Sequence, residues 1–207
     1  MQDGDPQTAR VQKVFDEWAL GGRAEGMERR HGPFARRGFD WLEVGAGDRY
    51  LDIGCGNGYT VRWAAAVDPS VTAIGLDIAD EMVKLATTMS KELANASFVC
   101  DEFPSPRLMG GSLQAIFSME ALYYLPDLDG ALAEVRRLLA PEGRFACVVD
   151  FFEEHEESRQ WPVDLGVEMT RLSIAGWREA FERAGLEVCH QELLEKSLIT
   201  CGKPRRG

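Results

Sequence analysis

Three glycines alternate with other residues at Gly54, Gly56 and Gly58. They follow the short apolar run Tyr50 to Ile53 and precede a segment with helical periodicity, so they are expected to form a strand-to-helix turn. Because glycine has no Cβ, such a turn lets a ligand approach the backbone closely. The spacing differs from the G-x-G-x-x-G of dinucleotide-binding folds. The loop therefore indicates a nucleotide-like ligand without identifying it.

Two carboxylates stand where the next two predicted strands end. Asp77 lies 19 residues after Gly58, and Asp101 follows the third strand. Asp77 is suited to accept both hydroxyls of a ribose, and Asp101 to receive the exocyclic amine of an adenine, through charge-assisted hydrogen bonds. A single Asp at a strand end is often only a turn or helix cap. Because ligands of open α/β sheets bind at the carboxyl ends of the strands, the set predicts an adenosine site.

Alternating strands and helices must position these residues. Strands are predicted at Tyr50–Ile53, Val71–Leu76, Phe98–Cys100, Leu113–Phe117 and Phe145–Phe152, with an antiparallel edge hairpin at Leu186–Cys189 and Ser197–Cys201. Helical periodicity marks residues 60–67, a segment capped by Asp80, a segment capped by Asp127, and residues 174–184. This alternation predicts an α/β, doubly wound sheet with helices on both faces.

The N-terminal segment reads as a helical addition to the sheet. Residues 11–44 are expected to be helical with breaks at Gly21–Gly22 and Gly32–Pro33, after a frayed stretch at 1–10. Phe15 and Trp18 are either a lid over the ligand or core packing of an amphipathic helix. We expect one domain: an N-terminal lid or substrate region at 1–44, a ligand-binding core at 45–152, and a C-terminal helix and edge hairpin at 153–207.

Composition restricts the partners. The chain has 207 residues, 45% hydrophobic and 28% charged, with a formal net charge of −11, as expected of a globular protein that repels nucleic acid and anionic membranes. Its five cysteines contain no CxxC pair, and no apolar segment is long enough to span a membrane. We expect a cytoplasmic protein without a metal site. The run Glu153–Glu157, which contains His155, reads as a solvated acidic segment rather than a metal site.

A basic cluster interrupts this acidic background near the N-terminus. Its arginines are Arg23, Arg29, Arg30, Arg36 and Arg37. They form either a solvated helix face or a clamp for an anionic group of the substrate, such as a carboxylate. His31 lies among them as a surface residue or as a base or substrate contact.

Five segments together resemble class I S-adenosylmethionine-dependent methyltransferases of the small-molecule, methyltransferase type 11-like kind. They are YLDIGCGNG at 50–58, AIGLDIADEMV at 73–83, FVCDEFP at 98–104, AIFSMEALYYLPD at 115–127 and LLAPEGRFACVVDF at 138–151. The resemblance covers about residues 49–151. It implies a Rossmann-like seven-stranded sheet, parallel with one antiparallel strand, and S-adenosylmethionine as cofactor, with S-adenosylhomocysteine as product.

The resemblance also implies roles for individual residues. Gly54, Cys55 and Gly56 would border the methionine portion of the cofactor, and Asp52 would orient that loop or reach the ammonium. Around the nucleoside it places Asp77, Ile78, Met82, Asp101, Glu102 and Phe103. Ser118 and Met119 would form the floor beside the sulfonium, and Trp18 is a further candidate contact.

The candidates for catalysis follow from the predicted topology. Methyl transfer is an in-line displacement that depends mainly on alignment and exclusion of water, and a base is needed only for a nucleophile that arrives protonated. Glu120 and Tyr124 follow the fourth strand, and His31 lies in the N-terminal segment. Tyr123 and Tyr124 are expected to point in different directions, with Tyr124 toward the substrate.

Several alternatives stay open. A dinucleotide-dependent oxidoreductase is disfavoured by the glycine spacing. A non-catalytic domain could bind the cofactor as a sensor or stabilise a partner, and an aminopropyl transferase would need further strand-end carboxylates. The segment after the fourth strand lacks the Asn/Asp-Pro-Pro-aromatic sequence of enzymes that methylate DNA amines. A small-molecule acceptor is therefore preferred, whether the protein is a monomer or a homodimer.

Overall fold

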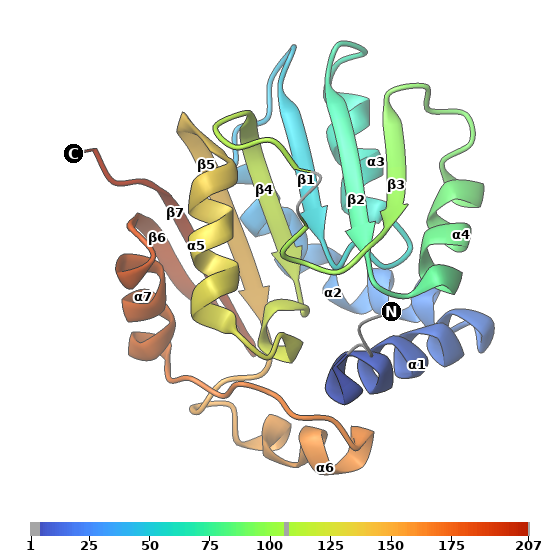
Figure 1. Ribbon diagram of the computed structural model, residues 1–207, viewed down its shortest axis with the longest axis vertical. Helices are drawn as coiled ribbons and strands as arrows, with labels where there is room; N and C mark the ends of the chain where they lie inside the picture. Colours follow the sequence, from blue (N-terminus) through green and yellow to red (C-terminus); the bar gives the residue numbers. More distant parts are fainter. Residues whose placement is uncertain (1–4, 106–107, 207) are drawn as a thin grey trace.

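The strands form one seven-stranded sheet in the order β3-β2-β1-β4-β5-β7-β6. The computed structural model describes residues 5–105 and 108–206. Its strands are β1 Arg49–Ile53, β2 Thr72–Asp77, β3 Ala96–Cys100, β4 Leu113–Met119, β5 Leu139–Val149, β6 Leu186–Leu194 and β7 Ser197–Pro204 (Figure 1). β7 runs antiparallel to both of its neighbours, and the other neighbouring strands pair in parallel. The predicted Rossmann-like sheet with one antiparallel strand is confirmed.

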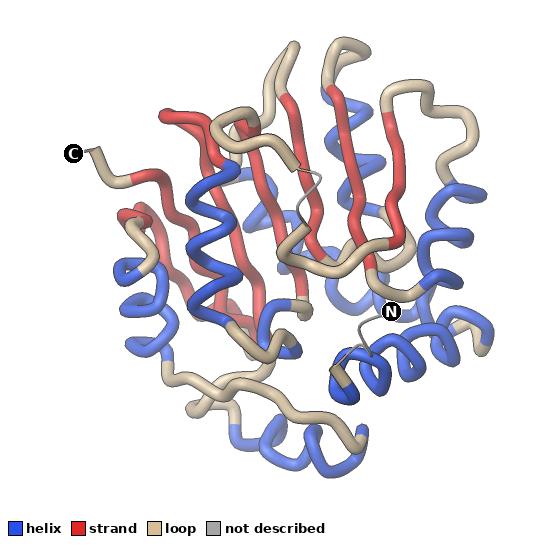
Figure 2. Tube along the Cα trace, viewed as in Figure 1, coloured by secondary structure: helices blue, strands red, loops and turns tan. Residues whose placement is uncertain are grey.

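Helices cover both faces of this sheet. The described helices are α1 Pro6–Leu20, α2 Arg23–Asp40, α3 Tyr59–Val67, α4 Asp80–Met89, α5 Leu128–Leu138, α6 Trp161–Leu165 and α7 Ile174–Arg183, with short 3-10 turns at Leu122–Tyr124 and Glu156–Gln160. α2 and α3 pack on one face, and α5 and α7 on the other (Figure 2). α1 and α6 lie at the carboxyl ends of the parallel strands, where they face each other across the end of the sheet (Figure 1).

The central strands are apolar on both sides because both faces are covered. On β4, Ile116 packs with the core under α5 and α7, whereas the next residue, Phe117, packs with the core under α2 and α3. Phe145 and Ala146 on β5 alternate in the same way. This alternation follows from successive side chains of a strand pointing to opposite faces. β5 lies inside the sheet, between β4 and β7.

The predicted cap at Asp127 is confirmed, and the one at Asp80 is wrong. The Asp127 side chain accepts a hydrogen bond from the Gly130 amide at 2.9 Å. At α4 the N-cap is Ala79, and Asp80 is already helical. A residue far away in sequence does part of the capping, because Asp16 of α1 accepts from the Glu81 amide at 2.9 Å. A cap supplied across the fold leaves no local sequence signal.

The N-terminal helices differ from expectation at two places. The break at Gly21–Gly22 is confirmed, but α2 continues through Pro33. Packing of Phe34 and Phe39 against the sheet holds that helix together despite the proline. α1 begins at Pro6, inside the stretch expected to be frayed, because Asp5 caps it; residues 1–4 lie outside the described part. No helix in the described residues is both long and apolar enough to cross a bilayer.

Candidate active site

One cavity of about 550 Å³ opens at the carboxyl ends of the strands. Its walls come from the glycine loop after β1, from the ends of β2, β3 and β4, and from α1, α2 and α6. A volume of this size is ordinary for a small-molecule site. The cavity lies where the topology predicts a ligand, beside the point at which strand order reverses between β1 and β4.

The glycine loop is held in shape by backbone hydrogen bonds. The Gly54 and Cys55 amides donate to the Leu76 carbonyl at 2.8 and 3.0 Å. Gly54 has φ +74°, and a Cβ there would lie 2.3 Å from the Cβ of Ala121. Gly56 has φ +52°, but a Cβ there would meet nothing within 4 Å. Gly54 is therefore required by packing, whereas Gly56 keeps one wall of the cavity open for a ligand.

The carboxylates at the strand ends also organise the loops around the cavity. Asp77 accepts from the Gly56 and Ala79 amides at 2.8 and 2.9 Å. Burial raises the pKa of Asp77 to about 6, although these amides oppose the shift. Asp101 accepts from the Glu102 amide at 3.0 Å and the Ser105 hydroxyl at 2.7 Å. Both aspartates line the cavity, and each carboxylate oxygen can accept a second donor from a ligand.

Asp52 offers an unsatisfied acceptor beneath the glycine loop. One of its oxygens accepts from the Thr60 hydroxyl, and the other, Oδ1, is buried without a partner among the described residues. Burial raises the pKa of Asp52 to about 7, and the Thr60 hydrogen bond opposes the shift. A buried acceptor without a donor is costly unless a ligand satisfies it. An ammonium group fits this position chemically.

Nearly all of the cofactor contacts expected from the sequence line this cavity. They are Trp18, Asp52, Gly54, Cys55, Gly56, Asp77, Ile78, Met82, Asp101, Glu102, Phe103 and Met119. Ser118 is the exception, and its expected place in the floor is wrong. Its side chain is fully buried between β4 and β1, where its hydroxyl donates to the Ile53 carbonyl at 3.0 Å. Of these two residues, Met119 lines the cavity.

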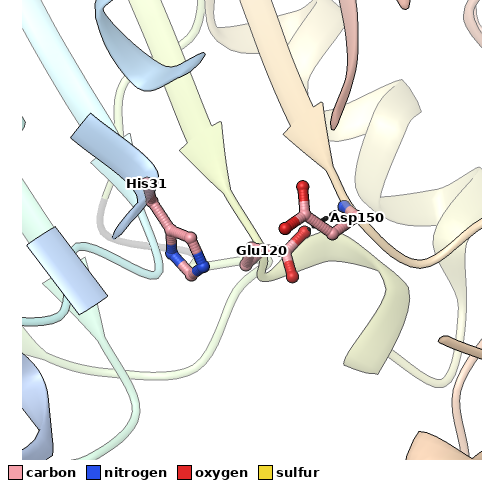
Figure 3. A group of neighbouring side chains, drawn as sticks. All are labelled: His31, Glu120 and Asp150. Atoms are coloured by element: carbon pink, nitrogen blue, oxygen red, sulfur yellow. Dashed lines mark hydrogen bonds between the residues drawn. The ribbon is translucent and has the colours of Figure 1, made fainter. Parts of the chain in front are cut away.

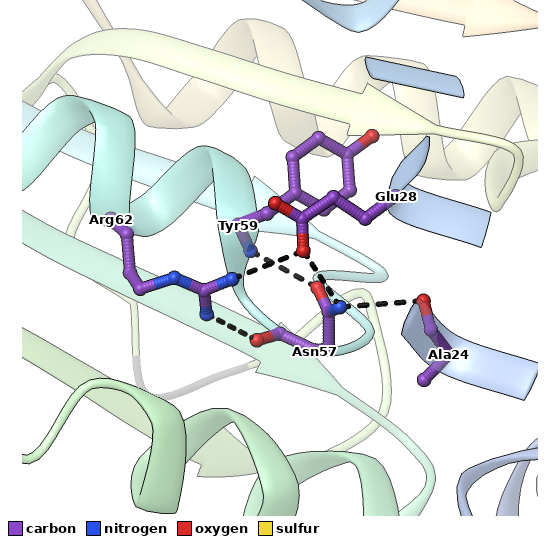
Figure 4. A network of polar contacts seen from close by, with 5 residues as sticks. All are labelled: Ala24, Glu28, Asn57, Tyr59 and Arg62. Atoms are coloured by element: carbon purple, nitrogen blue, oxygen red, sulfur yellow. Dashed lines mark hydrogen bonds and ion pairs between the residues drawn. The ribbon is translucent and has the colours of Figure 1, made fainter. Parts of the chain in front are cut away.

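A polar network ties α2 to the glycine loop (Figure 4). Glu28 accepts from the Asn57 side-chain amide at 3.1 Å and from the Arg62 guanidinium at 3.3 Å. Asn57 also donates to the Ala24 carbonyl at 3.3 Å, and Arg62 donates to the Asn57 carbonyl at 2.6 Å. The N-terminal helices are thus fixed to the loop that borders the ligand, and the Tyr59 amide joins the network at 3.3 Å through Asn57.

Trp18 and Phe15 fill both of the roles that the sequence left open, since they cover the cavity and also pack in the core. Their rings meet edge to face at 5.2 Å, and Phe15 meets Tyr124 in the same way at 5.4 Å. Both residues also pack against buried core residues, and both line the cavity. α1 therefore covers the cavity with an aromatic wall that is continuous with the core.

The three candidates for catalysis, His31, Glu120 and Tyr124, all line the cavity. Glu120 has φ +55°, a rare conformation for a residue with a side chain. It accepts from the Tyr123 hydroxyl at 2.7 Å and from the Asp150 amide. Burial, followed by the charge of Asp150, raises the pKa of Glu120 to about 8. Tyr123 and Tyr124 both line the cavity, so the prediction that only one would face it is wrong.

His31 is buried, and the interpretation as a surface residue is wrong. Burial, with the charges of Arg30 and Lys196, lowers the pKa of His31 to about 4, so the imidazole is neutral near pH 7. The Arg30 guanidinium donates to its Nε2 at 3.1 Å. His155 is placed elsewhere, with its Nδ1 at 2.5 Å from the Asp150 carbonyl, and it does not line the cavity.

The basic cluster is dispersed by the fold. Only Arg30 of its five arginines lines the cavity. Arg36 pairs with Asp40 at 2.8 Å, and Arg37 with Glu192 at 2.9 Å. Arg23 lies over the Trp18 ring at 4.8 Å from its centre. The structure therefore offers no multi-arginine clamp for an anion among the residues that it describes.

Sequence reasoning missed several cavity residues. Those that matter most are Met27, Glu28, Asn57, Thr60 and Trp161. Asn57 stands inside the glycine loop and could have been suspected from that position. The others come from α2, α3 and α6, and their sequence surroundings contain no signal of a ligand.

Comparisons with known proteins agree with this fold and cavity. Residues 51–147 match the model of a family described as a methyltransferase domain. A solved structure of the complex between the Haloferax volcanii Trm112 methyltransferase activator and the putative methyltransferase contains a similar chain. That chain is 31% identical, with a TM-score of 0.86 over 93% of this chain and 98% of its own.

Curated methyltransferases match this chain over shorter stretches. Nocamycin O-methyltransferase from Saccharothrix syringae is 34% identical over 63% of this chain and 48% of its own length. The 27-O-demethylrifamycin SV methyltransferase from Amycolatopsis mediterranei is 33% identical over 70% of this chain and 56% of its own. The chain thus spans about half the length of the curated relatives it matches.

Fold, cavity and relatives together define a nucleotide-cofactor-binding α/β protein of the methyltransferase class. The chain belongs to the class I S-adenosylmethionine-dependent methyltransferase family. S-adenosylmethionine is the cofactor of that family. The open wall at Gly56 and the unsatisfied Asp52 oxygen fit the methionine portion of S-adenosylmethionine.

Proposed function

We propose that this protein transfers a methyl group from S-adenosylmethionine to a small, largely apolar acceptor. The observation that carries the proposal is the continuity of the cavity. Its lining includes the glycine loop, where the cofactor would lie, and His31, Glu120 and an aromatic wall, where the acceptor would lie. We name these two parts the cofactor end and the acceptor end. A cofactor and an acceptor can therefore lie in line within one enclosed space, which is the main requirement of methyl transfer.

The cofactor end would use the residues described above. Asp52 would accept from the ammonium, Gly54, Cys55 and Gly56 would border the methionine portion, and Asp77 would accept from the ribose hydroxyls. The remaining contacts proposed around the nucleoside, the sulfonium and the cover of the cavity are Trp18, Ile78, Met82, Asp101, Glu102, Phe103 and Met119. When bound, the cofactor supplies a methyl carbon already activated for displacement.

The acceptor end would bind an apolar molecule with one polar group. Val11, Phe15, Tyr124, Trp161 and Leu165 supply apolar surface there. His31, Glu120 and the Tyr124 hydroxyl would orient the nucleophilic atom, and the helices above would exclude water. With Arg30 as the one member of the basic cluster at the cavity, a neutral acceptor is favoured over the anionic one considered from the sequence.

The test is transfer of labelled methyl from S-adenosylmethionine to a panel of acceptors that share size and apolarity but differ in the polar group. Phenols, enols, amines and carboxylates form such a panel. Transfer to a neutral hydroxyl compound, lost in Gly56→Val, supports the proposal. Tight S-adenosylhomocysteine binding without transfer to any class would favour a non-catalytic cofactor-binding domain instead.

A second candidate adds a protein partner to the same activity. The similar Haloferax volcanii chain was solved in a complex with an activator, and the likeness covers nearly the whole of both chains. We propose that this chain also works with a small activator subunit. Co-expression with a Trm112-like protein tests this: a stable complex with faster methyl transfer supports it, and activity of the isolated chain that no such protein increases contradicts it.

A further inference from the structure

Three metal-ligating side chains from distant segments meet at the acceptor end of the cavity. His31 comes from α2, Glu120 from the residue after β4, and Asp150 from the residue after β5 (Figure 3). One ligand atom of each lies within 4.8 Å of the others. Because the residues are far apart in the chain, their spacing in the sequence gives no metal motif, and no metal site is expected from it.

The two carboxylates are held in place by neutral donors. The Asp150 amide and the Tyr123 hydroxyl bond to Glu120, and the Ser197 hydroxyl donates to Asp150 at 2.5 Å. Neither carboxylate forms an ion pair within the described part of the chain. Hydrogen bonds that orient ligand side chains are the usual outer layer of a protein metal site.

A separate observation comes from Tyr59 on α3. Its side chain lines the same cavity, it is only 8% exposed, and its hydroxyl has no partner among the described residues. Burial raises the pKa of that hydroxyl, as do the charges of Asp52 and Glu28, with smaller contributions from Glu120 and Asp150. A buried hydroxyl without a partner can bind a polar group that enters the cavity between Asp52 and Glu120.

We infer that His31, Glu120 and Asp150 bind one divalent cation, of the Mn²⁺ or Zn²⁺ type, at the acceptor end of the cavity. A ligand set of one imidazole and two carboxylates suits such ions better than it suits ions that prefer oxygen ligands alone. Glu120 and His31 line the cavity, and Asp150 lies behind them, so open coordination positions of the ion would face the acceptor. The consequence for catalysis rests on the proposed function: a cation there lowers the pKa of a bound acceptor hydroxyl.

Arg30 opposes this binding in the structure. Its Nε donates to His31 Nε2 at 3.1 Å, and its charge lies near both carboxylates. Coordination through Nε2 requires this guanidinium to move away. The site thus predicts that Arg30→Gln binds Mn²⁺ more tightly than the unmodified chain.

The direct experiment is a titration of the full, chelator-treated chain with Mn²⁺, in which free Mn²⁺ is measured by electron paramagnetic resonance. We expect one saturable site that Zn²⁺ competes for. Glu120→Gln and Asp150→Asn should each weaken it by about 10-fold or more, in line with effects of altering metal ligation. Asp164→Asn is the matched control, since Asp164 is an exposed carboxylate that lines the same cavity outside the cluster.

Two further measurements distinguish failure of the metal site from failure of the proposed function. The unmodified chain with Mn²⁺ should show nitrogen hyperfine coupling from His31, which needs no variant to fold. S-adenosylhomocysteine binding, measured on the same samples, should be unchanged in Glu120→Gln. Absence of a saturable site, or of nitrogen coupling, overturns the metal site while leaving the proposed function intact. Loss of S-adenosylhomocysteine binding by the unmodified chain would instead contradict the proposed function.

Discussion

The two ends of the cavity are built in different ways. The cofactor end is formed mainly by short segments that directly follow β1, β2 and β3, and these segments hold one another through backbone amides and the Asp77 carboxylate. The proposed acceptor end is assembled from α1, α2, α6 and the residues after β4. A site made from strand ends can be recognised in the sequence, whereas a site made from helices that cover them depends on the whole fold.

The largest effect expected at the cofactor end is that of Gly54→Ala. The new Cβ would lie 2.3 Å from that of Ala121, at a residue with φ +74°. The left-handed conformation costs about 1–2 kcal/mol and overpacking about 1–3 kcal/mol. Thermal or denaturant unfolding should therefore show a loss of about 2–5 kcal/mol.

Gly47→Ala provides the matched control for that variant. Gly47 has φ +79°, but a Cβ there would meet nothing within 4 Å, so only the conformational cost applies. Equal losses of stability in the two variants would show that close packing of the glycine loop on Ala121 is not important.

The next effect concerns the charge of Asp52 and its dependence on pH. Burial raises the pKa of this acid to about 7 from an ordinary value of 3.8. The folded state thus holds the proton more tightly than the unfolded state, so Asp52 lowers stability as pH rises from about 4 to about 7. Asp52→Asn should remove up to about 4 kcal/mol of this loss, because one pKa unit corresponds to about 1.4 kcal/mol.

The measurement is the unfolding free energy of both proteins between pH 5 and pH 8. The gain from Asp52→Asn should grow with pH, and S-adenosylhomocysteine binding should weaken in the same variant. Other acids with raised pKa values, such as Asp77, are present in both proteins, so the difference reports Asp52 together with its smaller interaction with Asp77. A gain that does not change with pH would contradict the assigned shift.

Asp77→Ala should weaken S-adenosylhomocysteine binding by roughly 10- to 100-fold, because hydrogen bonds to charged groups are worth about 1.5–3 kcal/mol. It removes both the proposed ribose contacts and the bond that fixes the Gly56 amide. Asp80→Ala, at an exposed position three residues later, should leave the affinity unchanged. Unaltered binding in a folded Asp77→Ala protein would show that the cofactor lies elsewhere.

Tyr124→Phe probes the acceptor end with a smaller effect. Loss of one neutral hydrogen bond to the acceptor should slow methyl transfer by about 2- to 10-fold. S-adenosylhomocysteine affinity should not change, because Tyr124 is not among the residues proposed to contact the cofactor.

The smallest expected effect is that of Glu28→Gln, which weakens the link between α2 and the glycine loop. The Glu28–Arg62 pair is partly exposed, so the loss in affinity should be at most about 5-fold, as for pairs worth up to about 1 kcal/mol. Glu192→Gln is the matched control. It alters the ion pair between Glu192 of β6 and Arg37 of α2, neither of which lines the cavity, and should have no effect on S-adenosylhomocysteine binding.

Much of the fold could be predicted because its signals are local. Apolar runs marked the central strands, Asp127 capped α5, and the short segments after Gly185 paired as an edge hairpin. Most of the proposed cofactor contacts could be predicted for the same reason, since they lie at or just after the end of a strand. Trp18 and Met82 differ, because they lie on α1 and α4. Ser118 was misplaced because the register of β4 with β1 turns its hydroxyl toward the Ile53 carbonyl.

The acceptor end could not be predicted to the same depth. Whether Pro33 ends a helix, and whether His31 is buried, depends on the packing of α2 against the sheet. Arg30 is the one member of the basic cluster at the cavity, because Arg36 and Arg37 pair with other residues. Asp150 meets His31 and Glu120 only when strands and helix are assembled.

The central claim is that the glycine loop and the strand-end carboxylates form an S-adenosylmethionine site. Calorimetric titration of the purified chain with S-adenosylhomocysteine, and separately with NAD, tests it most directly. The structure predicts one site with micromolar affinity for S-adenosylhomocysteine and no binding of NAD. Binding of NAD, or of neither compound, by the folded chain would contradict the claim.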